Sequence, residues 1–266
     1  FGIEVSHVSP VDVDEWKAAI KPNTKLFFLE TPSNPLGEVA DLEALAELAH
    51  SIGALLVVDN SLLSPVGSQP LKHGADISVS SATKAIDGHG RVMGGVLAGS
   101  EELMTQVAVY CNSCGLAMSP FNAWQLLSGV ETLSLRMEKQ FDNALKIAQW
   151  LQQQPQVQAV YYTGLPDHPQ AELIRKQQNG GGIVIGFEVA DQEAAWKIVD
   201  GVELFSRTAN LGDVRSTITH PWTTTHGRMQ PEEKLAANIR PGLVRLSVGL
   251  EYVDDLIEDL KQVLNK

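Results

Sequence analysis

Five polar residues that could do chemistry stand directly after apolar runs of the sequence: Asn34, Asp59, Ser81, Thr83 and Lys84. The lysine amine can condense with an aldehyde and afterwards carry protons as a general base. The aspartate can keep a pyridine nitrogen protonated, so that the ring accepts electrons. The two hydroxyls can donate hydrogen bonds to a phosphate. Each residue alone is more often a turn or capping residue, but together and in this order they predict a site for a phosphorylated pyridine aldehyde.

The apolar runs that precede these residues, 25–30, 54–58 and 76–80, are continuous rather than alternating. Continuous runs of this length are typical of buried parallel strands. A helix is expected to begin at Asp41, between the first two runs, and a further strand is expected at 92–99. We therefore expect an α/β unit with a mostly parallel sheet covered by helices on both faces. Because ligands gather at the C-terminal ends of parallel strands, the polar residues should meet at one edge of that sheet.

The pattern of apolar residues changes after residue 119. From Pro120 to Gln154 apolar side chains recur at helical spacing, and Pro155 ends the pattern, which predicts one long helix bridging two domains. The remainder mixes short strands and helices, which predicts a smaller α+β domain. Within it, strands are expected at 157–162, 182–189 and 243–249, and a final helix at 253–264. The expected division is a large sheet domain over 1–119, the bridging helix over 120–154 and the α+β domain over 155–266.

Composition narrows the classes of partner and compartment. The chain of 266 residues has 32 acidic and 20 basic residues and a formal net charge of −12, which repels nucleic-acid phosphates and anionic membranes. Its two cysteines, Cys111 and Cys114, form no disulfide framework and have no second pair to complete a zinc site. No apolar run has the length of a membrane span, and no signal peptide opens the sequence. We expect a cytoplasmic enzyme without a metal, a nucleic-acid partner or a membrane partner.

Four segments of the sequence carry a family resemblance: ETPSNP (30–35), VVDNSLLSP (57–65), LKHGADISVSSATK (71–84) and GHGRVMGG (88–95). In register they resemble the Cys/Met-metabolism family of fold-type-I enzymes that use pyridoxal 5′-phosphate (PLP). This family includes cystathionine γ-synthase, cystathionine lyases, methionine γ-lyase and the homoserine-ester sulfhydrylases. The resemblance extends to LVRLSVGLE near the C-terminus. It implies PLP as the cofactor and a PLP-binding large domain followed by a smaller C-terminal domain.

The resemblance also implies a cofactor role for each of the five polar residues. Lys84 is the implied catalytic lysine, which forms the Schiff base with PLP. Asp59 is the implied partner of the pyridine nitrogen, and Ser81 and Thr83 are implied phosphate ligands. Asn34 is implied to lie near the phenolic oxygen of the cofactor and near the substrate carboxylate.

A substrate-binding arginine is implied at Arg245, which in the family grips the α-carboxylate, with Ser216 as its neighbour. The strand pattern agrees for the arginine, because the apolar residues of 243–249 take one strand face and leave Arg245 on the other. A planar guanidinium also suits a bidentate contact with a carboxylate.

Two segments, 210–229 and 118–137, look most like O-succinylhomoserine sulfhydrylases. The implied reaction is a γ-replacement in methionine biosynthesis, in which O-succinylhomoserine and sulfide give homocysteine and succinate. A cystathionine γ-synthase, a γ-lyase or a methionine γ-lyase would use the same residues. A non-catalytic fragment that needs another chain is the alternative from a different class. The family expectation for assembly is a homo-oligomer, a homotetramer built from dimers.

The start of the sequence leads us to expect further protein upstream of Phe1. The chain opens there without Met, inside a stretch that resembles a strand. PLP phosphates are normally cradled by a glycine-bearing turn at a helix N-terminus, and no such unit precedes Asn34. We therefore expect the N-terminal part of the large domain to be missing and residues 1–266 alone to be inactive.

Overall fold

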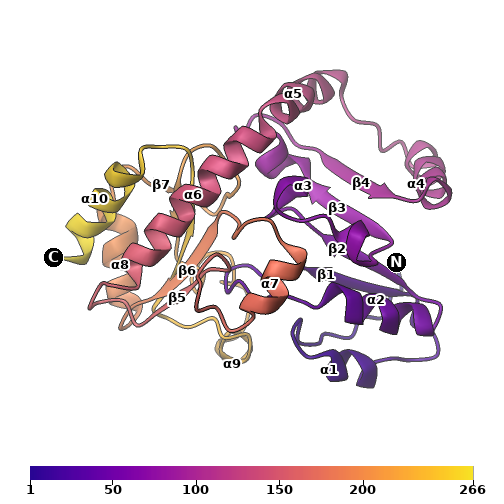
Figure 1. Cartoon of the computed structure of the whole chain (residues 1–266), viewed down its shortest axis with the longest axis horizontal. Coiled ribbons are helices and arrows are strands. Elements are labelled where there is room, and N and C mark those ends of the chain that lie inside the picture. Colours follow the sequence, from indigo (N-terminus) through magenta and orange to yellow (C-terminus); the bar gives the residue numbers. More distant parts are fainter. Residues whose placement is uncertain (266) are drawn as a thin grey trace.

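Two β-sheets organise the computed structural model, which describes residues 1–265 (Figure 1). In the first sheet the strand order is β1-β2-β3-β4; the first three strands run parallel, and β4 runs antiparallel to β3. The predicted α/β class and the mostly parallel sheet are therefore confirmed. The strands are β1 (Leu26–Glu30), β2 (Leu55–Asp59), β3 (Ile77–Ser81) and β4 (Gly95–Gly99).

Helix α2 (Leu42–Ser51) covers one face of the first sheet. Asp41 caps this helix, as predicted, by accepting a hydrogen bond from the backbone N–H of Ala44 at 3.1 Å. On the opposite face, Leu26 and Phe28 of β1 are 50% and 57% exposed. Within residues 1–265, the helices expected on both faces therefore cover only one face of β1.

The second sheet is mostly antiparallel and has the strand order β5-β6-β9-β8-β7. Its core packs beneath helices α6 (Leu133–Leu151), α8 and α10, and α10 has the bounds that its periodicity predicts. The short strands β7 and β8 were not predicted, because two or three residues are too few to show a period. The elements are β5 (Ala159–Tyr161), β6 (Val184–Glu188), β7 (Ser206–Arg207), β8 (Thr217–Thr219), β9 (Leu243–Ser247), α8 (Gln192–Gly201) and α10 (Val253–Leu264).

The expected bridging helix is broken into α5 (Pro120–Glu131) and α6 (Leu133–Leu151). Thr132 separates them with φ −112° and ψ 6°, so the prediction of one continuous helix over 120–154 was wrong. The apolar stripe also changes environment at this break. Trp124 and Leu127 before the break are 61% and 64% exposed, whereas Met137 after it is fully buried. Helical spacing alone did not reveal which part of the stripe packs against protein.

The remaining elements are short or lie at the periphery. Residues 1–9, which look strand-like in the sequence, form no strand. No helix among residues 1–265 is both long enough and apolar enough to cross a lipid bilayer. The other elements are α1 (Val13–Ala18), α3 (Ser64–Gly67), the 3-10 helix η1 (Pro70–His73), the π-helical turn η2 (Ala82–Ile86), α4 (Glu101–Ser113), α7 (Ala171–Gln177) and α9 (Pro231–Ala236).

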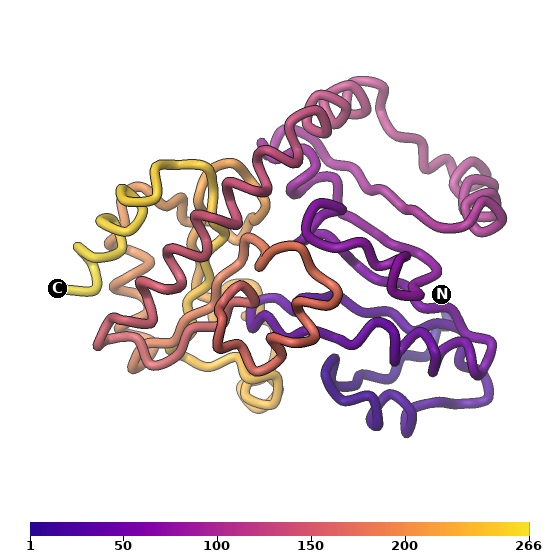
Figure 2. The backbone as a smooth tube through the Cα atoms, in the orientation of Figure 1, coloured from indigo at the N-terminus to yellow at the C-terminus, as the bar shows by residue number. Residues whose placement is uncertain are grey.

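The two sheets lie side by side, and α6 runs diagonally from α5 toward the second sheet (Figure 1). Figure 2 shows that early and late parts of the chain occupy different halves of the molecule, with the two termini at opposite ends. The loops that follow β1 and β3 meet the second sheet, since Asn34 contacts Arg245 and Lys84 contacts Asn210. The edge at which the sequence places its polar residues therefore faces the other half of the molecule.

Gly129 allows α5 to approach the turn that carries Lys84. A Cβ at this position would collide with the carbonyl oxygen of Ile86 and lie 3.1 Å from Cα of Asp87. Alanine is the better helix former by about 1 kcal/mol, yet we expect Gly129→Ala to lower the free energy of unfolding by about 1–2 kcal/mol through overpacking. Urea unfolding measures this change. Ser128→Ala, on the exposed side of the same helix, is the control and should be neutral or slightly stabilising; equal stability of the two variants would contradict the close approach.

Candidate active site

Lys84 lies in η2, which begins where β3 ends. Its dihedral angles, φ −86° and ψ −127°, depart from helical values inside this turn. Its Nζ donates a hydrogen bond to Oδ1 of Asn210 at 3.0 Å. Burial lowers the pKa of Lys84, and the positive charge of Arg245 lowers it further. A lysine in this environment more readily presents the neutral amine that carbonyl chemistry needs.

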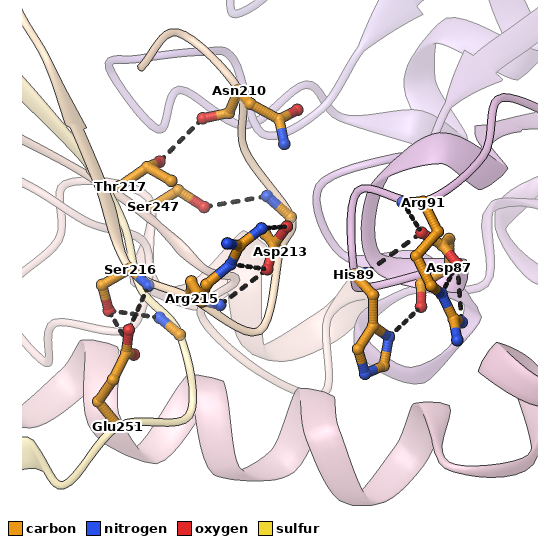
Figure 3. Close-up of polar contacts among 12 residues, drawn as sticks. Asp87, His89, Arg91, Asn210, Asp213, Arg215, Ser216, Thr217, Ser247 and Glu251 are labelled. Carbon is orange, nitrogen blue, oxygen red and sulfur yellow. Dashed lines mark hydrogen bonds and ion pairs between the residues drawn. The ribbon is translucent and has the colours of Figure 1, made fainter. Parts of the chain in front are cut away.

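Asn210, the hydrogen-bond partner of Lys84, belongs to the loop before β8, and hydrogen bonds hold this loop to β8 and β9 (Figure 3). The Thr217 hydroxyl donates to the Asn210 carbonyl at 2.8 Å, and the Gly212 N–H donates to Oγ of Ser247 at 3.0 Å. Gly212 has φ +80°, and a Cβ there would lie 2.9 Å from Cβ of Lys84. The loop can approach the lysine this closely only with glycine at that position.

The sequence analysis did not single out Asn210. An asparagine in a loop is commonly a turn residue, so its type alone gives no reason to place it in a site. The available signal was its place at the start of 210–229, the segment that most resembles one subgroup of the family.

Asp59 ends β2, where it pairs in register with Glu30 of β1. Its Oδ1 accepts a hydrogen bond from the Ser61 N–H at 2.9 Å, and Oγ of Ser61 accepts one from the Ser81 N–H at 2.7 Å. These bonds tie the end of β2 to the end of β3. The half-buried Asp59 carboxylate therefore lies at the sheet edge from which the Lys84 turn begins.

Glu30 adds a second carboxylate to this edge, because residues paired across parallel strands point to the same face. Its side chain keeps contact with solvent. Even so, the surrounding protein removes enough water to raise the pKa of Glu30 to about 7; the charge of Asp59 also raises it, and that of Arg245 opposes the shift. The sequence analysis did not identify Glu30, since its effect depends on these neighbours.

The hydroxyls of Ser81 and Thr83 flank the start of η2. Oγ1 of Thr83 accepts a hydrogen bond from the Gly94 N–H at 3.1 Å and lies 3.4 Å from the Gly94 carbonyl oxygen. The Thr83 hydroxyl is therefore already engaged with the backbone of Gly94, just before β4, while Ser81 is half-buried at the end of β3. The phosphate role of both residues stays a prediction.

Arg245 brings a positive charge from β9 into the interior, where it is only 2% exposed. Its Nη2 donates to the Ala209 carbonyl at 2.7 Å, and its Nη1 lies 3.4 Å from Oδ1 of Asn34, which joins the two halves of the site. Its Nε has no hydrogen-bond partner, and no residue among 1–265 forms an ion pair with it. Burial lowers the pKa of Arg245 to about 10, and Glu30 opposes that shift. A buried guanidinium without a carboxylate partner is suited to bind the carboxylate of a ligand.

Ser216, the expected neighbour of Arg245, lies elsewhere (Figure 3). Its hydroxyl donates to Glu251 at 2.8 Å and accepts from the Gly249 N–H at 2.8 Å. The register of β8 and β9 places Thr219, not Ser216, opposite Arg245. The Ser216 hydroxyl thus holds the end of β9, and its role in substrate binding stays a prediction.

The donor set at this edge fits a phosphorylated pyridine aldehyde. Lys84 offers an amine of lowered pKa, Asp59 offers a carboxylate for a ring nitrogen, and Arg245 offers an unpartnered buried Nε. These groups come from β2, η2 and β9, so both halves of the molecule contribute to one site. Among residues 1–265, no group of three or more His, Cys, Asp or Glu side chains could hold a metal ion.

Comparison with known proteins matches residues 1–265 to the family described as Cys/Met metabolism PLP-dependent enzyme. The O-succinylhomoserine sulfhydrylase of Pseudomonas aeruginosa is 52% identical over 265 residues, which are 99% of this chain and 66% of that protein. The L-methionine gamma-lyase of Porphyromonas gingivalis is 44% identical over 269 residues, which are 100% of this chain and 67% of that protein.

The fold also matches a solved structure, cystathionine gamma-lyase from Lactobacillus plantarum complexed with L-serine. The TM-score is 0.93 at 35% sequence identity, and the match covers 98% of this chain and 68% of that one. The chain thus spans about two thirds of the length of these relatives.

The raised pKa of Glu30 predicts a pH dependence of stability. In the folded protein this pKa is about 7, above the ordinary value of 4.5. Its stabilising contribution is therefore complete below the unfolded value and is lost as pH rises through about 7. We expect the free energy of unfolding to fall between about pH 5 and about pH 8. Glu30→Gln should make this fall smaller by up to about 1 kcal/mol. The difference is limited because contact with solvent screens the charge of Glu30.

Urea unfolding at both pH values measures the difference between wild type and Glu30→Gln. Glu47→Gln, at an exposed position of α2, is the matched control and should keep the wild-type slope. An unchanged slope in Glu30→Gln would show that Glu30 is ordinarily solvated.

Proposed function

The chain belongs to the Cys/Met metabolism PLP-dependent enzymes, and we propose that it replaces the acyl group of O-succinylhomoserine with sulfide, giving homocysteine and succinate. The observation that supports an amino-acid substrate is Arg245, a buried guanidinium without an acidic partner, whose charge is near enough to lower the pKa of Lys84. The choice of O-succinylhomoserine is supported by the 52% identity to a sulfhydrylase of that name. The cofactor is PLP.

When bound, PLP takes up the electrons released at Cα of the amino acid and returns them later. Lys84 would hold the cofactor covalently, and its amine would then remove the Cα proton of the amino acid and help to move a proton at Cβ. Asp59 would keep the pyridine nitrogen of the bound cofactor protonated. Arg245, in contact with Asn34, binds and orients the α-carboxylate. Asn210 orients Nζ of Lys84 through their hydrogen bond.

A γ-lyase would use these same residues but would need no incoming sulfide. Its leaving group would be a thiol from the substrate rather than succinate. The identity to a methionine gamma-lyase and the structural match to a cystathionine gamma-lyase favour such activities as the second candidate. A cystathionine γ-synthase differs only in its nucleophile, cysteine. A non-catalytic fragment would keep the fold but not the chemistry of Lys84.

We further propose that the protein assembles as a homo-oligomer, the family expectation being a homotetramer. Large apolar side chains that are at least 40% exposed gather on β4, on α4, on α5 and in the segments beside them, which supports burial against another subunit. That residues 1–266 alone are inactive stays a prediction. The exposed side chains are Met93, Val96, Leu97, Val109, Tyr110, Leu116, Met118, Phe121, Trp124, Leu127 and Val130.

Removal of the lysine amine tests the cofactor attachment. We expect Lys84→Ala to lower turnover at least about 10³-fold, because both the covalent attachment and the base are lost. Borohydride treatment followed by peptide mass analysis should find PLP on the peptide that contains residue 84 in wild type, and not in the variant. Lys72→Ala, an exposed lysine of η1, is the control and should behave as wild type. PLP fixed to another lysine in the Lys84 variant would overturn the assignment.

Product analysis tests the proposed reaction. With O-succinylhomoserine and sulfide we expect homocysteine and succinate in equal amounts, with little 2-oxobutyrate. Parallel reactions replace sulfide with cysteine, or O-succinylhomoserine with methionine or cystathionine. Preferential formation of 2-oxobutyrate would show a γ-lyase, preferential formation of cystathionine would show a γ-synthase, and either result would contradict the sulfhydrylase proposal.

A further inference from the structure

One face of α6 carries three buried polar residues: Arg136, Gln140 and Asn143, which are 5%, 0% and 0% exposed. Their spacing places them on one side of the helix, one above the other. Polar side chains are seldom buried without hydrogen bonds, and all three donate to backbone carbonyl groups of other segments. We refer to these residues as the donor stripe of α6.

Arg136 is the first residue of the donor stripe, and it donates hydrogen bonds to the two residues that end η2. Its Nη1 donates to the Ala85 carbonyl at 2.7 Å, and its Nη2 donates to the Ile86 carbonyl at 3.1 Å. The same Nη2 donates at 2.7 Å to the carbonyl of Gly129, at the end of α5. Its Nε donates to Oγ1 of Thr132 at 3.0 Å. One planar guanidinium thus joins η2 to the break between α5 and α6.

The carbonyl groups of Ala85 and Ile86 need these donors. The turn η2 ends at Ile86, so no continuing helix supplies N–H groups to them. Both residues are buried, at 1% and 7% exposure, which keeps water away. The following Gly88 has φ +68°, and a Cβ there would collide with Nη1 of Arg136. Glycine at this position therefore leaves room for the guanidinium.

Gln140 lies one helical turn further along the donor stripe. It binds the loop that carries Asn210, the hydrogen-bond partner of Lys84. Its Nε2 donates to the Asp213 carbonyl at 3.0 Å and to the Val248 carbonyl at 2.8 Å. Asp213 lies in the loop of Asn210, whose Oδ1 receives the hydrogen bond of Lys84. Arg136 and Gln140, one turn apart on the same helix, therefore bind the two segments that carry Lys84 and Asn210.

We propose that Arg136 is a positioning residue for Lys84, holding the carbonyl groups of Ala85 and Ile86 so that the lysine amine meets Asn210. The proposal rests on the proposed role of Lys84 as the amine that binds PLP. Loosening of η2 would let water reach the lysine nitrogen and move it away from Arg245. Because burial and the charge of Arg245 both lower the pKa of Lys84, the proton affinity of that nitrogen should then rise.

The test is a pH titration of the visible absorbance of the PLP-loaded enzyme, which reports protonation of the nitrogen joining Lys84 to the cofactor. Arg136→Lys keeps the charge but replaces the planar fork with a point donor. Thr132→Val removes only the oxygen that orients Nε, at an exposed position. Leu256→Ala, a core change in α10, is the control for a general loss of stability. All three variants retain the charged groups near Lys84, which are Arg245, Asp59 and Glu30.

We expect the midpoint of Arg136→Lys to rise by about one pH unit, that of Thr132→Val to rise by less, and that of Leu256→Ala to stay at the wild-type value. If Arg136→Lys does not fold, the titration midpoint of Thr132→Val decides whether Arg136 positions Lys84. A rise supports the proposal, and no change contradicts it. An unchanged midpoint in folded Arg136→Lys, or an equal rise in Leu256→Ala, would show that Arg136 contributes only to stability. The titration needs no acyl-homoserine, so its outcome is independent of the proposed reaction; a PLP band that persists unchanged in Lys84→Ala would instead contradict the proposed role of Lys84.

Discussion

Buried backbone carbonyl groups that no helix or strand can pair are the constraint on which this site depends. The turn carrying Lys84 is short, and the carbonyl groups at its end lie away from water. The donor stripe of α6 supplies their hydrogen bonds and also donates one to the loop that carries Asn210, at the Asp213 carbonyl. Since both sets of bonds originate from one helix, the two halves of the site hold a fixed relative position. The polar face of α6 is thus as much a part of the fold as the apolar cores.

The positive and negative charges at the site lie on different sides of it. Arg245 is buried without an acidic partner, whereas Asp59 and Glu30 lie together at the end of the neighbouring strands. A ligand carboxylate would complete the hydrogen bonds of Arg245 at the same time as it neutralises a buried charge. Loss of surrounding water, together with the negative charge of Asp59, makes Glu30 hold its proton more tightly. This distribution of charge supports the proposed binding of a ligand carboxylate at Arg245 and of a protonated ring nitrogen at Asp59.

Apolar periodicity indicated where helices form, but not what they pack against. The stripe that begins at Trp124 continues in register past Thr132 and predicts one long helix. In the structure, the part before the break is exposed and the part after it lies in the core. Both parts satisfy the same helical spacing, because periodicity records only that one face differs from the other. The break itself coincides with the close contact at Gly129 and with the hydrogen bonds of Arg136.

The sequence by itself determined the parallel strands, the cap at Asp41 and the strand ends that carry Asp59 and Lys84, because these depend on local burial patterns and short-range chemistry. It also placed Arg245 on a strand, where the structure has it. Only the tertiary structure brought Asn210 to the lysine 126 residues away, and Arg136 to the carbonyl group of Ala85, 51 residues away. Such pairs leave no periodic signal in the sequence. They exist because folding buries polar groups that must then find whichever donor or acceptor lies closest in space.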